Sequence, residues 1–433
     1  MSKKETYQTA RGTRDILPKD QPFYQMVRRT SECVLQSLGI KRIDLPTFEN
    51  VEIFTRGIGK DTDIVSKEMY LVSKRDADSK DPTFALRPEG TAGAVRSYIE
   101  NGMGSMPQPV RIYYIGSMYR HDRPQKGRYR EFYQVGVEIF GDRSSKSDYL
   151  SIMTAWKILS DLGLKNLIVY TNSIGCPVCR PKYTKKLKLY FKKNLNKLCS
   201  DCKVRYEENP LRLLDCKEDE CKKIAKGAPL IIDNICTECK DHFQSTLELL
   251  DYFEIRYDLD PYLVRGLDYY SRTVFEIAAK TDKDRQNSLG GGGRYDGLVE
   301  TLGGTKTPAV GYSLGIDRIV ELMKEQKIKP TEIRGVEVCI LQLGEKAKEV
   351  AKKVYDMLSK NDTNVVFVPS NDGLRPQMRQ AVKTGAKYAL IIGQKEALKQ
   401  EVILRNLEAS SQETFFVKDI LEEIHKRIEK DKC

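Results

Sequence analysis

The densest positive charge in the sequence lies at residues 120–130, RHDRPQKGRYR, which contain five Arg or Lys, one Gly and one Pro. The residues on both sides alternate as strands do, so we expect a hairpin with this segment at its tip. Five like charges in so short a segment repel one another unless an anion neutralises them. The tip therefore predicts a binding site for an anion.

The strand that follows the tip, EFYQVGVEIFG, carries an unusual polar row. Because strand side chains alternate between faces, Phe132, Gln134, Gly136 and Glu138 share one face, and apolar side chains share the other. The apolar face is predicted to be buried. The polar row combines an aromatic ring, an amide, a glycine and a carboxylate, which are groups that can bind a small molecule.

The partner strand adds Gly116 and Arg120 to the same face. A solvent-exposed sheet face would explain the polar side chains, but not the aromatic ring or the two glycines, Gly116 and Gly136. We favour a floor for a planar ligand that carries phosphate, with open room above both glycines. Phe132 would stack on the ligand, Arg120 would bind the phosphate, and the carboxylate would recognise a polar group.

The overall composition agrees with an anionic partner. The 433 residues predict two to four domains, and a net charge of +12 favours a polyanion over a merely basic, solvated surface. No apolar run approaches the roughly 18 residues of a membrane span, and the first residues have no apolar signal core. We therefore expect a soluble, cytoplasmic protein with no membrane partner.

Eight of the eleven cysteines lie in one segment, and an odd total argues against a disulfide framework. They are Cys176, Cys179, Cys199, Cys202, Cys216, Cys221, Cys236 and Cys239. The three CxxC pairs among them could contribute to two tetrahedral all-sulfur zinc sites. Structural zinc is therefore possible, but from the sequence alone we favour reduced thiols.

The elements that position these residues follow from hydrophobic spacing and turn residues. We expect a β-α-β-α-β pattern after a polar linker at 325–335. In the part of the chain before the linker, Pro88 and Glu89 suit the first turn of a helix. The other expected elements are helices at 19–38, 149–162 and 313–325 and strands at 83–87, 110–119, 131–141, 262–279 and 287–292.

Three stretches in order resemble the motifs of class II aminoacyl-tRNA synthetases. LGIKRIDLPTFE resembles motif 1, whose proline (Pro46) packs at a dimer interface, and the basic hairpin resembles motif 2. GYSLGIDRIVEL resembles motif 3 and carries Arg318. Two more stretches, LVRGLDYYSRTVFE and SLGGGGRYDGL, resemble the signature motifs of the histidyl-tRNA synthetase family, which TFALRPEGTAG also fits.

The resemblance covers nearly the entire chain and implies an α+β fold. An antiparallel-sheet catalytic domain would span 1–325, with a small helical, Cys-rich insertion at 175–250. A C-terminal α/β domain at 335–433 would bind the anticodon. The implied reaction is the ATP-dependent ligation of L-histidine to tRNA(His) through histidyl-adenylate, with release of AMP and pyrophosphate, in a homodimer that uses ATP and Mg²⁺.

The resemblance also assigns roles to residues. Arg265 would be catalytic and stabilise charge between the histidine carboxylate and the α-phosphate, which Arg120 would hold from the other side; Arg318 would hold the γ-phosphate. Matching positions are Glu89, Thr91, Gln134, Glu138, Arg265, Tyr269 and Tyr270 for histidine, Arg120, Phe132, Arg318, Gly291 and Gly292 for ATP, and Arg123, Gln125 and Arg128 for tRNA.

Two other functions compete with this assignment. One is a synthetase-like paralogue that regulates histidine biosynthesis or senses uncharged tRNA, and such relatives usually lose parts of the signature motifs. The other is a zinc-dependent nucleic-acid-binding module, which would leave Phe132, Gln134 and Glu138 unexplained. Because Arg120, Arg265 and Arg318 are all present and the domain at 335–433 is intact, we favour the enzyme.

Overall fold

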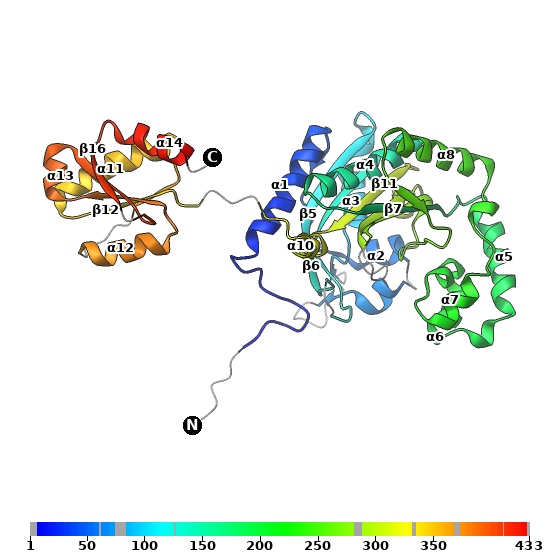
Figure 1. Cartoon of the computed structure of the whole chain (residues 1–433). Coiled ribbons are helices and arrows are strands. Elements are labelled where there is room, and N and C mark those ends of the chain that lie inside the picture. The colour runs from blue at the N-terminus through cyan, green and yellow to red at the C-terminus, as the bar shows by residue number, and fades with distance from the viewer. Residues whose placement is uncertain are drawn as a thin grey trace, which may run out of the picture. The chain divides into compact units, whose positions relative to one another are not determined.

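The alternating residues around the basic tip form two ten-residue strands, β5 (Val110–Tyr119) and β6 (Glu131–Phe140), in the computed structural model shown in Figure 1. Gly116 pairs with Gln134 and Met118 with Phe132, so the predicted polar row is confirmed. The structure describes residues 7–59, 62–73, 84–124, 127–280, 288–330, 335–367, 373–409 and 411–430.

The chain divides into two compact units, Met1–Pro330 and Thr331–Cys433. The first unit is built on an eight-stranded sheet in which the central neighbours are antiparallel and both edge pairs are parallel. Its order is β1 (Lys41–Arg42), β5, β6, β11 (Ala309–Gly315), β10 (Ser288–Arg294), β9 (Ser271–Ala279), β7 (Leu167–Ser173) and β8 (Tyr257–Leu259).

Helices bury the apolar face of this sheet. Val135, Val137 and Ile139 of β6 are almost completely buried in one core with Ile158 and Ile319. The helices that contribute to this core include α1 (Gln21–Ser37), α4 (Ser145–Asp161) and α10 (Ile316–Glu325). The polar row of β6 therefore points to the opposite face, which we call the site face.

Short elements on the site face bring further residues to the sheet. A three-stranded sheet has the order β2 (Phe48–Asn50), β4 (Phe84–Leu86) and β3 (Leu71–Val72). The helices here are α2 (Val51–Gly57), α3 (Thr91–Glu100) and α9 (Leu298–Thr301), with a π-helix at Ile64–Glu68 and a 3-10 helix at Met103–Ser105. Because α3 begins at Thr91, the prediction that Pro88 and Glu89 lie in its first turn is wrong by two residues.

The Cys-rich insertion is helical, and Figure 1 shows α5, α6 and α7 in green, set apart from the sheet. Its helices are α5 (Arg180–Lys192), α6 (Ser200–Glu208), α7 (Asp219–Ala225) and α8 (Thr237–Tyr252), with 3-10 turns at Leu195–Lys197, Pro210–Asp215 and Ile232–Asn234. Helix α8 returns the chain to the sheet, where it packs on α4.

The predicted strand at 262–279 is half wrong, because only Ser271–Ala279 pairs as β9. The preceding residues form turns and a loop. The side-chain amide of Asn172 donates to the carbonyl oxygens of Pro261 (3.2 Å) and Leu263 (3.1 Å), so a side chain satisfies backbone groups that a strand would pair in the ladder. The loop at 263–270 therefore carries part of the candidate site.

The second unit has its own sheet and core. The sheet has the order β13 (Val365–Phe367), β12 (Val338–Gln342), β14 (Tyr388–Ile392), β15 (Glu401–Asn406) and β16 (Gln412–Phe416). The first three strands are parallel, and the last two add antiparallel pairs. Its helices are α11 (Glu345–Lys360), α12 (Leu374–Lys383), α13 (Gln394–Lys399) and α14 (Ile420–Lys430).

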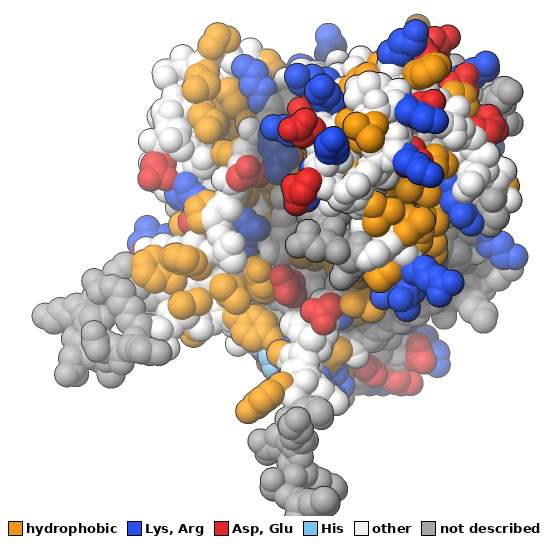
Figure 2. Space-filling view, turned by 90° about the vertical axis from the view of Figure 1, so that its left-hand side faces the viewer, with side chains coloured by type: hydrophobic (Ala, Val, Ile, Leu, Met, Phe, Trp, Pro, Cys, Tyr) orange, Lys and Arg blue, Asp and Glu red, His pale blue; other side chains and the backbone are white. Residues whose placement is uncertain are grey.

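The positive net charge of the chain does not form a continuous basic patch on every face of the molecule. On the face drawn in Figure 2, Lys and Arg side chains are scattered among acidic, hydrophobic and neutral ones. Within the described residues, no helix is both long enough and apolar enough to cross a membrane.

Candidate active site

The carboxyl group of Glu138 is the buried centre of the site face. Its side chain is fully inaccessible to solvent and accepts hydrogen bonds from Thr91 Oγ1 (2.8 Å), Tyr114 OH (3.0 Å) and Tyr295 OH. Burial raises the pKa of Glu138 to about 8, although the three hydroxyl donors oppose the shift. At neutral pH the carboxyl of the free protein therefore carries a proton much of the time.

The two glycines of the polar row have a different use from the one predicted. A Cβ at Gly136 would overlap the ring of Tyr114, and one at Gly116 would lie 2.5 Å from Nη2 of Arg87. The expectation of open room above both glycines is therefore wrong, because these two side chains occupy it. The glycine at 136 lets the Tyr114 ring lie against the sheet, from where its hydroxyl reaches Glu138.

Glu89 is a second buried carboxyl, in the segment between β4 and α3. It accepts hydrogen bonds from the backbone N–H groups of Thr91 (2.7 Å) and Ala92 (2.8 Å), the first residues of α3. The hydroxyl of Tyr269 lies 3.5 Å from the same carboxyl group. Burial raises the pKa of Glu89 despite these donors. Thr91 thus connects both buried carboxyls, since its N–H bonds Glu89 and its hydroxyl bonds Glu138.

Two adjacent tyrosines from the loop at 263–270 form the aromatic side of the site. The ring centroids of Tyr269 and Tyr270 are 4.6 Å apart, and Tyr269 also packs on Tyr295 at 5.6 Å. Tyr270 is the more buried of the two. The predicted pair is therefore brought to the two carboxyls, and Tyr295 joins it.

Arg265 comes from the same loop and lies over β10. Its Nη1 is 3.2 Å from Oε2 of Glu276 on β9, and its Nε is buried without a hydrogen-bond partner among the described residues. Burial by itself lowers the pKa of Arg265, but the nearby carboxylate and the two tyrosines outweigh it and raise the pKa. The guanidinium of Arg265 is thus permanently charged, and its Nε–H remains available to donate a hydrogen bond to a ligand.

The run of glycines at 290–293 lies in β10, the strand beneath that guanidinium. A Cβ at Gly291 would come within 3.1 Å of Arg265 Nη1 and would also collide with the backbone of β9. A Cβ at Gly292 would collide with the backbone of β11. The glycines therefore allow close approach of protein groups on both sides of the strand.

Arg120 and Gln134 face the site from the basic hairpin. The Arg120 guanidinium lies 5.4 Å from the ring centroid of Phe132, and its Nε donates to the carbonyl oxygen of Pro88 at 2.8 Å. Burial lowers the pKa of Arg120. Within the described residues, Oε1 of Gln134 is buried without a donor, and such an acceptor needs a ligand or water to complete it.

A third arginine approaches from α10. Arg318 donates from Nη1 to the carbonyl oxygen of Ser288 (2.7 Å) and from Nε to that of Gly127 (3.2 Å). Burial lowers the pKa of Arg318, and the positive charges of Arg128 and Arg120 lower it further. The hairpin and α10 therefore create one positive region, where a polyphosphate would relieve the mutual repulsion.

The predicted tRNA contacts lie at the tip of the hairpin. Arg123 is exposed, whereas Arg128 forms a 3.4 Å ion pair with Asp122. Gln125 lies outside the described residues. The tip is therefore less positive than the count of basic residues suggested, because an acidic side chain within it compensates one of them.

Sequence reasoning missed four residues of the site: Arg87, Tyr114, Glu276 and Tyr295. Strand alternation places Tyr114 in the same row as Gly116 and could have revealed it. Tyr295 lies in SLGGGGRYDGL, but only the tertiary fold shows that its hydroxyl reaches β6.

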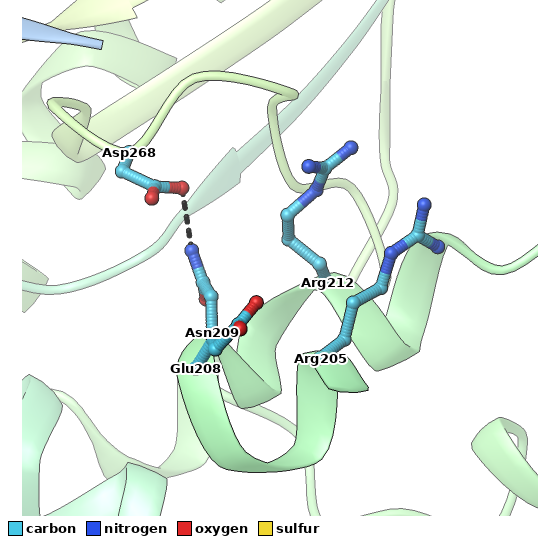
Figure 3. A pocket seen from close by; sticks show the side chains of 5 residues that line it. All are labelled: Arg205, Glu208, Asn209, Arg212 and Asp268. Carbon is cyan, nitrogen blue, oxygen red and sulfur yellow. Dashed lines mark hydrogen bonds between the residues drawn. The ribbon is translucent and has the colours of Figure 1, made fainter. Parts of the chain in front are cut away.

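The insertion supports the loop at 263–270 from the outside. Figure 3 shows Asn209 and Asp268 pointing toward each other, and the Asn209 amide donates to Oδ1 of Asp268 at 2.6 Å. Arg205 and Arg212 line the same shallow pocket and pair with Oδ2 of Asp63 at 3.1 and 3.0 Å. Polar contacts thus connect the insertion to the loop that carries Tyr269 and to the start of the π-helix at Ile64–Glu68.

The eight cysteines of the insertion form two separate clusters. The inner cluster contains Cys176, Cys179, Cys236 and Cys239, and the outer cluster contains Cys199, Cys202, Cys216 and Cys221. Within each cluster, all sulfur atoms lie within 4.8 Å of one another. Either set could hold a metal ion.

Comparison with known proteins matches both units. The family model described as histidyl-tRNA synthetase matches residues 12–175 and 192–319, and the model described as anticodon binding domain matches residues 337–427. A histidine–tRNA ligase of Acetivibrio thermocellus is 44% identical over 406 residues, which cover 94% of this chain and 96% of that protein. One from Dehalococcoides mccartyi is 42% identical over 98% of this chain and its own full length.

Solved structures agree with this result. The apo histidyl-tRNA synthetase of S. aureus is 31% identical, with a TM-score of 0.79, over 97% of this chain and all of that one. A Bacillus halodurans structure titled as an ATP phosphoribosyltransferase regulatory subunit/histidyl-tRNA synthetase is 21% identical, with a TM-score of 0.64, and covers 91% of this chain and all of its own. This similarity shows the fold alone. The two ligases named above are more than 40% identical to this chain over nearly its full length. The chain belongs to the histidyl-tRNA synthetase family of class II aminoacyl-tRNA synthetases.

Proposed function

We propose that this protein activates L-histidine with ATP on the site face and transfers the histidyl group to tRNA(His). A carboxylate oxygen of histidine attacks the α-phosphorus, pyrophosphate leaves, and a terminal ribose hydroxyl of tRNA then displaces AMP. The observation that carries the proposal is that three arginines from different elements come together: Glu276 pairs with Arg265 and also interacts with Arg318, which in turn is repelled by Arg120. The buried carboxyl of Glu138 lies on the site face of the same sheet. The arginines suit phosphate and the carboxyl suits an imidazole.

Histidine recognition would use the acceptors of the site. Glu89, Thr91 and Gln134 would bind the amino group, and the amide oxygen of Gln134, which has no donor among the described residues, supplies an acceptor. In its ionised form, which a bound imidazole N–H would favour, the Glu138 carboxylate can accept about four hydrogen bonds, and it receives three from hydroxyl groups. The fourth position is suited to an imidazole N–H. Tyr269 and Tyr270 would enclose the ring.

ATP would bind across the positive region. Arg120 would hold the α-phosphate while Phe132 stacks on adenine, and the strand that contains Gly291 and Gly292 would lie beneath the adenylate. Arg318 would hold the γ-phosphate. The resemblance of the chain to its family supports each of these roles.

Charge stabilisation in the first step would come mainly from Arg265. Its Nε, which has no acceptor in the part of the chain that the structure describes, and its fixed positive charge suit the position between the attacking carboxylate and the α-phosphate. Mg²⁺ would accompany the ATP phosphates, and Glu276, the carboxylate beside this arginine, is suited to share it.

The remaining partners follow from the family. Arg123, Gln125 and Arg128 would contact the tRNA acceptor end, and the unit at 335–433 would bind the anticodon. The catalytic domain at 1–325 would carry the insertion at 175–250. A homodimer would form through the motif-1 stretch around Pro46, near which the Phe48 side chain is 57% exposed. Because charged tRNA supplies translation, we place the reaction in the cytoplasm.

The deciding experiment is ATP–pyrophosphate exchange with each standard amino acid and Mg²⁺. Wild type should exchange with histidine alone, and Arg265→Ala should reduce the rate at least about 100-fold. Arg256→Ala removes an exposed arginine directly before the edge strand β8 and should leave exchange unchanged. If folded wild-type protein exchanges with no amino acid, the protein acts as a regulatory paralogue and the proposal is wrong.

A further inference from the structure

The inner cluster has the geometry of a tetrahedral metal site. Sγ of Cys176 lies 3.7 Å from that of Cys179 and 3.8 Å from that of Cys236, and the sulfurs of Cys179 and Cys239 are 3.9 Å apart. Zinc–sulfur bonds of about 2.3 Å in a tetrahedron place the sulfur atoms about 3.8 Å apart. The observed separations match this value.

The outer cluster repeats the arrangement with different local structure. Sγ of Cys199 lies 3.8 Å from Sγ of Cys216, and all four sulfurs fall within the same 4.8 Å limit. Cys199 and Cys202 come from the start of α6, Cys216 follows a 3-10 turn, and Cys221 lies in α7. Four residues from three elements thus point their sulfur atoms to one position.

Backbone donors surround the sulfur atoms. The N–H of Cys176 donates to Sγ of Cys179 at 3.2 Å, the N–H of Cys199 to Sγ of Cys221 at 3.3 Å, and the N–H of Cys202 to Sγ of Cys199 at 3.4 Å. Such donors stabilise negative charge on sulfur, which is the form that binds zinc.

The geometry of these cysteines agrees better with metal binding than with disulfide bonds or with ordinary buried thiols. The cysteines in the described part of the chain are free, and the separations are far from the roughly 2.05 Å of a disulfide bond. Ordinary buried thiols pack as small apolar groups and need no common centre. Here the eight cysteines of the insertion divide into two sets of four, and each set is complete.

We propose that each cluster binds one Zn²⁺ ion, so that one chain carries two structural zinc ions. Four thiolates complete a tetrahedron and leave no position for substrate, which gives the ions no part in adenylate chemistry. The proposal is independent of the function inferred above.

The inner ion would fix one wall of the active site. The cluster joins the end of β7 to the starts of α5 and α8. Arg180, directly after Cys179, donates from Nη2 to the carbonyl oxygens of Tyr270 (2.5 Å) and Gly175 (3.1 Å). The position of Tyr270 therefore depends on the segment that this ion would hold.

The outer ion would stabilise the helices that carry Asn209 and Arg212. Asn209 bonds Asp268, as Figure 3 shows, and Arg212 pairs with Asp63. The region is small and has a modest apolar core that includes Leu187, Phe191 and Leu213, and a metal would add to the stability that this core supplies.

The first test is the metal content of the whole protein, purified without chelators and measured by inductively coupled plasma mass spectrometry. We expect two zinc ions per chain. Paired serine variants should each lose one ion, Cys176→Ser with Cys236→Ser from the inner cluster and Cys199→Ser with Cys216→Ser from the outer one. Cys33→Ser removes an exposed cysteine outside the insertion and should keep both.

If the serine variants fail to fold, a second measurement on wild-type protein tests the same proposal. Wild-type protein stripped of metal and titrated with Co²⁺ should show the absorption of tetrahedral cobalt–thiolate centres, which should saturate at two ions and disappear when Zn²⁺ is added. Zinc well below one ion per chain together with no such absorption would overturn the proposal. One ion per chain would overturn it for the cluster whose serine variant keeps that ion.

Discussion

At the scale of single residues, the site is defined by a carboxyl that the protein buries at a cost. Desolvation disfavours the ionised form of Glu138, and three hydroxyl groups recover only part of that cost. A protein gains nothing in stability from this arrangement. We propose that the gain lies in selectivity for histidine, because a substrate without a ring N–H would leave a buried acceptor unsatisfied.

Replacement of this carboxyl should separate histidine recognition from ATP binding. In Glu138→Gln, an amide NH₂ replaces one acceptor oxygen and faces hydroxyl donors. We expect kcat/KM for histidine in the exchange reaction to fall about 100-fold, with little change in KM for ATP. Glu131→Gln, on the same strand but half-exposed, is the matched control. Equal losses for both substrates would argue against a specific role in recognition.

The same residue predicts a pH dependence of stability. The pKa of Glu138 is about 8 in the folded protein against an ordinary value of 4.5. For a group whose folded-state pKa is raised, stability is fully present below the unfolded pKa and is lost as pH rises toward and through the folded one. Between about pH 5 and 8, wild type should lose up to about 1.4 kcal/mol of unfolding free energy per pH unit relative to Glu138→Gln.

Urea unfolding followed by tryptophan fluorescence can measure the stability difference between wild type and Glu138→Gln in the first unit, Met1–Pro330. Trp156, the one tryptophan of the chain, lies in α4 and reports on the first unit. Parallel stability curves for wild type and Glu138→Gln across that pH range would contradict the raised pKa.

At the scale of elements, the sequence predicted regular strands well and loops poorly. Alternation and turn residues located β5, β6 and the tip, because each strand has one buried face. The loop at 263–270 was misassigned because its apolar residues resemble a strand, while the side chain that satisfies its carbonyl groups lies far away in sequence. Strand β16 was missed because it is a largely exposed edge strand without an apolar face.

The inner part of the insertion should influence histidine more than ATP. Arg180→Ala removes the donor to the Tyr270 carbonyl and lets that loop relax. We expect KM for histidine to rise about 10-fold, while kcat and KM for ATP change less than about threefold. Lys182→Ala changes an exposed residue of the same helix and serves as control. A loss confined to kcat would place this arginine in another role.

The basic tip should act on tRNA more than on adenylation. Combined Arg123→Ala and Arg128→Ala should lower kcat/KM for tRNA charging about 10-fold and reduce its salt dependence by about two units of slope at most. Exchange with histidine should fall much less than charging does, because only Arg128 of the pair also contributes to the positive region around Arg318. Lys146→Ala with Lys157→Ala removes two exposed charges on α4 and should alter neither reaction. A drop in exchange equal to the drop in charging would place the tip in the ATP site.

At the scale of the whole molecule, we propose that adenylation and anticodon recognition belong to different units. The described site residues lie before Pro330, and the second unit has a core of its own. The sequence predicted this division from the polar linker and the change to a β-α-β pattern. It did not single out anticodon-binding residues, because a parallel sheet with amphipathic helices specifies a fold and not a ligand.

This division predicts how a truncated chain should behave. A protein containing residues 1–330 retains the eight-stranded sheet and both buried carboxyls, so exchange with histidine should stay within about threefold of the full chain. Charging of tRNA(His) should fall at least about 100-fold, because the contacts of the second unit are lost. The full chain with a protease site inserted at the linker controls for truncation itself, since it can be assayed before and after cleavage. If a folded 1–330 protein loses exchange, the second unit also shapes the active site; if it charges tRNA normally, the unit at 335–433 has no part in binding that tRNA.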